Sequence, residues 1–315
     1  MATSEQTEKL SIQQMIEEQR GKKTKKRIEK SIPIILFLIA SISVLTTFGI
    51  VFTLIFETIE FFQRVPFLDF IFGKEWLPFS NKEPLFGILP LIAGTLKVTA
   101  IAVVVAVPFG LASAVYLSEY ASDNTRRIIK PILEVLAGVP TIVYGFFALT
   151  FVTPLLQQFI PDLKIFNALS PGIVVGIMIL PMIASLSEDA MTSVPNSIRD
   201  GALALGATKL EVAVKVVLPA ALSGIMASIV LAVSRAIGET MIVSLAGGST
   251  PRFDFDMTDS IQTMTAYIVQ VSTGDAGFGT TIYYSIYAVG FTLFLFTLLM
   301  NWLAHAISKR FREEY

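Results

Sequence analysis

Residues 31–56 form a run of 26 consecutive residues without a single Asp, Glu, Lys or Arg. A helix of about 20 mostly apolar residues crosses the hydrocarbon core of a bilayer, so this run is long enough to span a membrane. It is too long for the apolar core of a signal peptide, and no small-residue cleavage motif follows it. We therefore predict that residues 31–56 form a transmembrane helix that is retained in the protein.

Five further segments have the same character, and the composition of the chain agrees with them. Hydrophobic residues make up 53% of the 315 residues and charged residues only 16%, against about 25% charged residues in an ordinary soluble domain. So few charges do not cover the surface of a soluble fold of this size. We predict an all-α, polytopic helical membrane protein with six transmembrane helices. The predicted spans are 31–56, 88–117, 135–156, 172–186, 219–246 and 281–307.

The basic residues between the spans predict the orientation, because Lys and Arg accumulate on the cytoplasmic side of a membrane. The two chain ends and the loops on their side hold 17 of the 24 basic residues, whereas the loops on the other side hold 5. Both termini are therefore predicted to be cytoplasmic, with residues 1–30 as a tail and 31–315 as the transmembrane domain. The basic run 22–27 is expected to set the topology at anionic lipid headgroups, and no nucleic-acid binding is expected of it.

Two loops on the opposite side have distinct compositions. Residues 57–87 carry eight aromatic rings, which favours a segment lying in the membrane interface with its rings at headgroup depth. In residues 249–280, Asp259 and Ser260 are expected to cap a short helix that reaches Val271. That helix is either a re-entrant gate element or a plain surface helix.

Charged residues inside the predicted spans are candidates for function, because each costs at least about 2.5–3.5 kcal/mol at the centre of a span. Arg235 and Glu239 are four residues apart, which puts both on one face of a continuous helix. They either neutralise each other for insertion or handle a substrate, and the forked donors of an arginine suit an oxyanion. Lys97 and Glu134 are expected to make structural ion pairs.

The segment 195–219 is predicted to form two short helices around a turn at Gly206. Pro195 is a start signal for the first helix, and Pro219 ends the second. A helix–turn–helix of small residues that protrudes from a membrane protein can sit in a groove on a soluble partner. It can then transmit the movement of that partner to the spans on either side.

This segment resembles the cytoplasmic coupling loop of import permeases of ATP-binding cassette (ABC) transporters, which has the pattern E-A-A-x3-G-x9-I-x-L-P. The spacing is unbroken, and three positions depart from the pattern: Asp for Glu, Gly for Ala and Val for Ile. The matching positions are Asp200, Gly201, Ala202, Gly206, Val216, Leu218 and Pro219.

A narrower resemblance is to the phosphate-specific members of this family. Residues 234–241 are similar to their Arg-Ala-x-Gly-Glu-Thr signature, and segments 83–90, 116–120 and 133–145 resemble their first membrane subunit, the PstC type. The resemblance covers about three-quarters of the chain. It implies a type I ABC importer permease fold, import of inorganic phosphate, and Arg235 and Glu239 on the substrate pathway.

The resemblance also implies partners in the inner membrane and on both of its sides. They are a PstA-type sister permease, two PstB-type ATPase subunits at the 195–219 loop, and an extracytoplasmic PstS-type phosphate-binding protein. The sequence contains no G-x-x-x-x-G-K-[ST] phosphate loop, so ATP hydrolysis is expected in a separate subunit. The chain itself is predicted to be no enzyme and to need no cofactor.

Three alternatives remain at this point. Permeases for other oxyanions, such as sulfate or molybdate, share the coupling loop. A secondary anion transporter more often shows inverted repeats, and no repeat is visible here. A membrane-embedded enzyme needs a catalytic constellation, for which a chain with no cysteine and one histidine, His305, offers no pattern.

Overall fold

The computed structural model describes residues 2–80, 83–274 and 276–310. The side chains of the basic run 22–27 and of His305 lie outside the described part. The chain divides into two compact units, Met1–Phe56 and Glu57–Tyr315, each described by itself. Helix α1 (Ala2–Phe62) makes up the first unit, and its last residues belong to the second.

The second unit is a helical bundle with one short hairpin, and η marks a π-helical segment. Strands β1 (Trp76–Leu77) and β2 (Leu85–Phe86) are antiparallel, with Trp76 opposite Phe86. The elements of its first half are α2 (Phe67–Phe72), α3 (Leu89–Val115), η1 (Tyr116–Tyr120), α4 (Asp123–Ala137), α5 (Thr141–Phe147), η2 (Ala148–Val152) and α6 (Thr153–Gln157). Those of its second half are α7 (Leu169–Thr192), α8 (Asn196–Ala204), α9 (Lys209–Val212), η3 (Ala213–Val217), α10 (Leu218–Ala220), α11 (Leu222–Ile237), α12 (Met241–Ala246), α13 (Met264–Thr273) and α14 (Thr281–Arg310).

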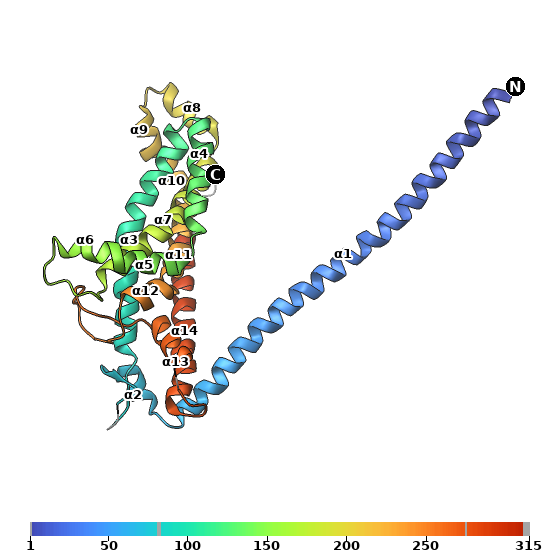
Figure 1. Cartoon of the computed structure of the whole chain (residues 1–315). Helices are drawn as coiled ribbons and strands as arrows, with labels where there is room; N and C mark the ends of the chain where they lie inside the picture. Colours follow the sequence, from blue (N-terminus) through green and yellow to red (C-terminus); the bar gives the residue numbers. More distant parts are fainter. Residues whose placement is uncertain (1, 81–82, 275, 311–315) are drawn as a thin grey trace. The chain divides into compact units, whose positions relative to one another are not determined.

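Four helical segments of the described residues are long and apolar enough to cross a membrane, and two bent helix pairs raise the number to six. The four are Ser31–Phe62, Leu89–Tyr120, Leu169–Thr192 and Thr281–Leu303. Length and composition thus agree with the predicted six spans when each bent pair is one span. The second unit has α8 and α9 at one end of its long helices and α2 at the other (Figure 1).

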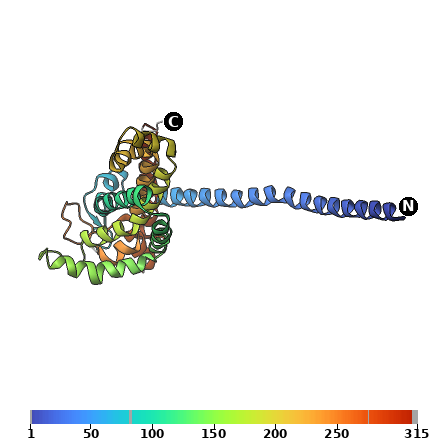
Figure 2. The ribbon, with the colours of Figure 1, turned by 90° about the horizontal axis from the view of Figure 1, so that it is seen from above.

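The third predicted span is not one straight helix, so that prediction was wrong in detail. Helix α4 and the helical run Thr141–Gln157 meet at an angle of 87°. Gly138 ends α4 and Pro140 begins α5, because proline disfavours helical backbone at the residue before it. The run α5–α6 consequently lies across the long axis of the bundle (Figures 1 and 2).

The fifth predicted span is also interrupted. The run Lys209–Ala220 meets α11 at 72°, and α11 ends at Ile237 with Gly238 as its C-cap. The chain resumes as α12 at Met241. The prediction of one helix through 219–246 was therefore wrong, and the break falls between the two charged residues that the sequence singled out.

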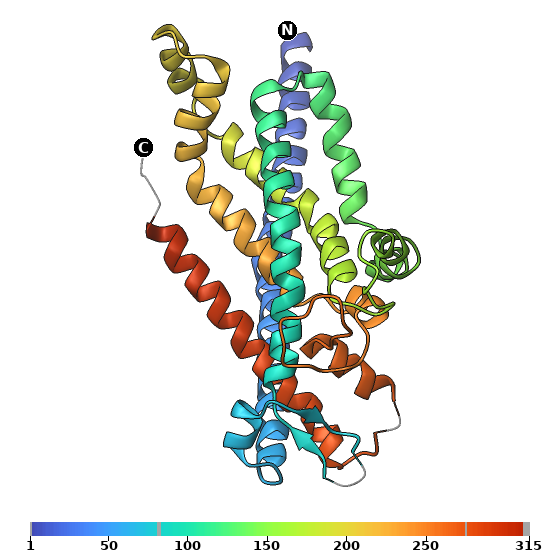
Figure 3. The same ribbon diagram turned by 90° about the vertical axis from the view of Figure 1, so that its left-hand side faces the viewer.

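Helices α3 and α7 form the centre of the bundle and approach each other closely at glycines. A methyl group added at Gly172 would lie 2.7 Å from Ile101 Cβ, and one at Gly176 would lie 2.8 Å from Val105 Cβ. Small residues allow such close packing of membrane helices, where dispersion contacts hold helices together. In Figure 3, α11 and α14 lie on one side of α3 and α4 on the other.

The aromatic rings of 57–87 do not all face the membrane interface. Phe61, Phe70, Trp76 and Phe86 are buried and pack edge to face, and Trp76 also meets Tyr267 of α13 with ring centroids 4.8 Å apart. The prediction of interfacial rings was wrong for these residues, because the hairpin folds back on the bundle and shares one apolar cluster with α13 and α14. Phe67, Phe72 and Phe79 remain exposed.

The helix expected from Asp259 begins later, at Met264. Thr263 is its N-cap and accepts a hydrogen bond from the backbone N–H of Ala266 at 3.2 Å. Asp259 instead forms ion pairs with two basic residues, Lys164 at 2.8 Å and Arg252. The carboxylate therefore fastens the loop before α13 rather than starting the helix.

Candidate functional site

Arg235 and Glu239 face each other across the break between α11 and α12. Arg235 Nη1 lies 3.5 Å from Glu239 Oε2. Because the helix ends between them, they do not share a helix face as the spacing predicted. The Arg235 side chain is 49% exposed, whereas that of Glu239 is 2% exposed.

Glu239 is fixed from several directions. Its Oε1 accepts from the backbone N–H groups of Met241, at 3.1 Å, and Ile242, at 3.4 Å, so it caps the start of α12. Its backbone carbonyl accepts from the hydroxyl of Thr265 in α13 at 2.7 Å. Oε2 has no hydrogen-bond partner among the described residues, and it points toward Arg235. The carboxylate therefore lies behind the guanidinium and holds it by charge.

Arg235 lines a hollow of about 330 Å³ between α4, α7 and α11. Its Nη2 is 4.0 Å from the sulfur of Met178. Among the described residues that line the hollow, Arg235 is the one cation and Glu134 the one anion, while Glu239 is not on the wall. The remaining lining residues are Leu133, Ala137, Met178, Ile179, Pro181, Met182, Ser185 and Leu186. The arrangement presents a positive charge among mostly apolar side chains. The lower dielectric constant of such surroundings strengthens the attraction between that charge and an anion.

The other two charges of the predicted spans differ in their surroundings. Lys97 is buried and its Nζ lies 2.5 Å from Asp254 Oδ1 and 3.1 Å from the carbonyl of Asp256, so its predicted pairing is confirmed. Glu134 is exposed on the hollow and makes no ion pair within the described part of the chain. The prediction of a structural pair was therefore wrong for Glu134.

The segment 195–219 forms two short helices around a turn, as predicted. Helix α8 follows Pro195, and the turn passes through Gly206 at φ +87°, a conformation that glycine adopts without strain. Thr208 and Glu211 then form a capping box that begins α9, with their reciprocal hydrogen bonds at 3.0 and 3.3 Å.

The seven motif residues of this loop separate into a tip and a base. Asp200, Gly201 and Gly206 are exposed at the tip beside Leu205, which is 91% exposed. Ala202, Val216 and Leu218 are half-buried against the apolar cluster that joins the loop to α3, α7 and α11, and Pro219 is exposed. The tip is consequently free to meet a partner, while the base is attached to the bundle.

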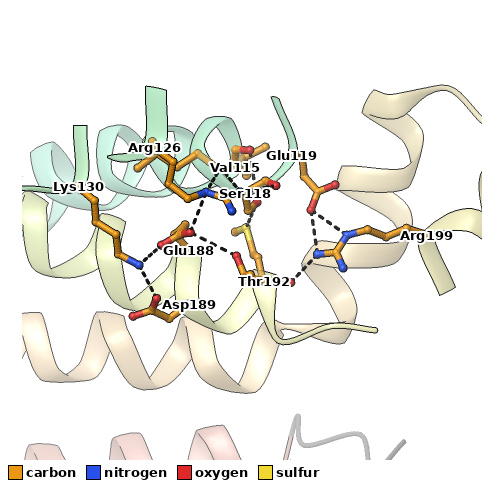
Figure 4. A network of polar contacts seen from close by, with 11 residues as sticks. Val115, Ser118, Glu119, Arg126, Lys130, Glu188, Asp189, Thr192 and Arg199 are labelled. Atoms are coloured by element: carbon orange, nitrogen blue, oxygen red, sulfur yellow. Dashed lines mark hydrogen bonds and ion pairs between the residues drawn. The ribbon is translucent and has the colours of Figure 1, made fainter. Parts of the chain in front are cut away.

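Sequence reasoning missed a network of charged side chains at this base (Figure 4). Arg199 of α8 reaches Glu119 of η1 at 3.1 Å, and Glu188 of α7 receives Lys130 of α4 at 2.6 Å. Arg126 of α4 lies 3.4 Å from Glu188. These residues come from four separate elements, so no local spacing indicated their contact.

The comparison with family models decides what kind of protein this is. Residues 106–313 match the family described as the binding-protein-dependent transport system inner membrane component. The chain belongs to this family. It is therefore a multi-pass membrane permease subunit, and the match includes the 195–219 loop and both sides of the α11–α12 break.

Curated relatives of the permease carry more specific names. It is 35% identical over 244 residues to a probable ABC transporter permease protein, YqgH, of Bacillus subtilis, which covers 75% of this chain and 77% of the relative. It is 33% identical over 261 residues to the phosphate transport system permease protein PstC of Mesorhizobium japonicum, with 77% and 78% covered. The predicted resemblance to ABC permeases of the PstC type is confirmed by these relatives.

Solved structures show that the permease has the predicted type I importer fold. A bacterial alginate ABC transporter, solved with alginate pentasaccharide-bound periplasmic protein, matches with a TM-score of 0.60 at 17% identity over 87% of this chain and 94% of that one. The inward-facing MetNI methionine ABC transporter matches with a TM-score of 0.54 at 18% identity, over 72% and 98%. At these identities the likeness concerns the fold alone.

Proposed function

We propose that this permease imports inorganic phosphate and that Arg235 contacts the anion during its passage. The observation that carries the proposal is Arg235, the single cation among the described residues on the wall of the 330 Å³ hollow. The relatives of the chain include phosphate transport system permeases, which supports phosphate as the anion. A guanidinium offers forked donors that match two oxygens of a tetrahedral anion. A sister permease of the PstA type would complete the pathway around the hollow.

Glu239 has a separate task in this proposal. Its carboxylate lies 3.5 Å from Arg235 and is buried, so it keeps the guanidinium in place while the hollow holds no anion. An arriving phosphate competes with Glu239 for the same donors. Phosphate near neutral pH keeps O–H groups that a carboxylate accepts, whereas sulfate has none, but Glu239 is 2% exposed and does not line the hollow. Its task is therefore to hold Arg235 rather than to contact the anion.

The loop 195–219 would couple the permease to a PstB-type ATPase. Its tip offers exposed Asp200, Leu205 and Leu210, a mixture of charge and apolar surface that suits a groove on a soluble protein. The two copies of the ATPase would lie beneath this permease and its sister. The split of basic residues supports cytoplasmic termini and a loop on the same side as the termini. Residues 1–30 would then be a cytoplasmic tail, and a PstS-type protein would deliver phosphate from the other side.

The test is transport by the complete complex of permease, sister permease, ATPase and binding protein in proteoliposomes. We expect ATP-dependent uptake of labelled phosphate that excess sulfate or molybdate does not inhibit. Uptake of sulfate or molybdate in place of phosphate would assign the chain to another oxyanion. Phosphate uptake without the ATPase subunit would identify a secondary transporter instead.

A further inference from the structure

We infer that Arg199 is a positioning residue that joins the coupling loop to α3 and α7, so that movement of the loop shifts the wall of the hollow. This inference rests on the proposed docking of the loop on an ATPase. It assigns a role to residues outside the seven motif positions.

Arg199 makes contacts to three segments at once. Its Nε and Nη2 donate to Glu119 Oε1 at 3.2 and 3.1 Å, which ties α8 to η1 at the end of α3. Its Nη2 also donates to the carbonyl of Met191 at 2.7 Å, and its Nη1 to that of Val194. These carbonyls belong to the last turn of α7 and to the link after it. The Arg199 and Glu119 side chains are only 14% and 10% exposed, so water screens the pair weakly.

The ends of α3 and α7 are joined to α4 by a second set of contacts (Figure 4). Glu188 of α7 is 2% exposed and lies between Lys130, at 2.6 Å, and Arg126, at 3.4 Å. The guanidinium of Arg126 also donates to the carbonyls of Leu117, at 2.7 Å, and Ser118, at 3.2 Å. Both carbonyls lie in η1, the last turn of the helical run that ends at Tyr120, where backbone carbonyls lack partners within the helix. Arg199 thus holds α8 to the ends of α3 and α7, which these contacts join to α4.

The two ends of the coupling loop connect to the bundle differently. The first end is fastened by Arg199 to the α3–α7 pair, whose helices pack closely at Gly172 and Gly176. The second end enters α11 through a 72° bend. Helix α7 provides Met178, while α11 provides Arg235, to the same hollow. A displacement of α8 is therefore passed through Arg199 to α7, which lines the hollow opposite Arg235.

The experiment measures phosphate transported per ATP hydrolysed in the reconstituted complex. Arg199→Gln and Glu119→Gln are each expected to lower this ratio by about fivefold or more, the usual lower bound of an energetic coupling between two sites. ATP hydrolysis continues and the ATPase still co-purifies, because the exposed tip is unchanged. The double variant should lose no more than Arg199→Gln alone, since that substitution already removes the contact with Glu119.

Arg252→Gln is the matched control, because it removes an arginine from an ion pair in the loop before α13, and Asp259 keeps Lys164. Its transport ratio is expected to equal that of the unaltered complex. A normal ratio in Arg199→Gln, additive losses in the double variant, or loss of ATPase co-purification would each overturn the inference. If the unaltered complex transports no phosphate, the proposed function fails instead, and the amount of another anion transported per ATP hydrolysed then tests the role of Arg199.

Discussion

Arg235 lies 3.5 Å from Glu239 although the helix that carries Arg235 ends between them. The break turns a pair that would neutralise itself along one helix face into a half-exposed cation with a buried anion behind it. The buried carboxylate caps α12 through its other oxygen, so its position is determined by the backbone. This geometry lets the cation meet an anion in the hollow while its counter-charge stays out of the path.

Glu239→Gln should slow phosphate uptake and leave the preference for phosphate over sulfate unchanged. The amide oxygen can still accept from Met241 N–H and preserve α12, but the charge that holds Arg235 is gone. Uptake of both anions by the reconstituted complex is the measurement. An unchanged rate would show that Glu239 does not hold Arg235, and an altered preference would show that the carboxylate meets the anion.

Glu134→Gln should make doubly charged anions such as sulfate better competitors of phosphate uptake. Glu134 is the one anion among the described residues lining the hollow, and its negative charge opposes a second negative charge on the substrate. We therefore expect sulfate to inhibit phosphate uptake more strongly in this variant than in the unaltered protein. Sulfate that fails to inhibit the variant, as it fails to inhibit the unaltered protein, would show that Glu134 does not face the anion.

Two glycines of the coupling loop should respond in opposite directions to alanine. Gly206 has φ +87°, so Gly206→Ala should cost about 1–2 kcal/mol and lower the melting temperature of the purified permease by about 2–8 °C. Gly201 lies inside α8 with open space where a methyl group would be added, so Gly201→Ala should raise that temperature by about 1–4 °C. Thermal unfolding in detergent measures both, and a stabilised Gly206→Ala would contradict the turn geometry.

The loop before α13 should lose stability in acid. The Lys164 ammonium holds the pKa of the Asp259 carboxyl below its ordinary value, and Ser260 N–H and Arg252 act in the same direction. A lowered carboxyl pKa stabilises the folded protein above about pH 4, and the contribution fades as pH falls through the lowered value. Lys164→Gln should thus lower the melting temperature by roughly 1–4 °C at pH 7. The difference from the unaltered protein should narrow below about pH 4, and a constant difference would contradict the assignment.

The sequence predicted features that depend on local signals. The spans follow from long apolar runs, and the coupling loop follows from Pro195, Gly206 and Pro219, which act within a few residues. Lys97 was correctly expected to be paired, because a buried ammonium needs a partner, although Asp254 as that partner lies 157 residues away.

Features that depend on tertiary contacts were beyond reach. The Arg199–Glu119 contact joins residues 80 positions apart, and the burial of Trp76 depends on Tyr267. The break after Ile237 had a local signal in Gly238, but glycine is tolerated inside membrane helices and did not predict an end. That Arg235 is half-exposed while Glu239 is buried could therefore be learned only from the structure.

Arg235→Gln in the complete complex is the decisive variant, with phosphate-stimulated ATP hydrolysis and phosphate uptake as its readouts. We predict that this complex assembles with its ATPase but loses both phosphate uptake and the stimulation of hydrolysis by phosphate-loaded binding protein. Arg235→Lys should recover part of the uptake, because the charge remains while the forked donors are lost. Uptake at the unaltered rate in Arg235→Gln would contradict the assignment of Arg235 as the phosphate contact.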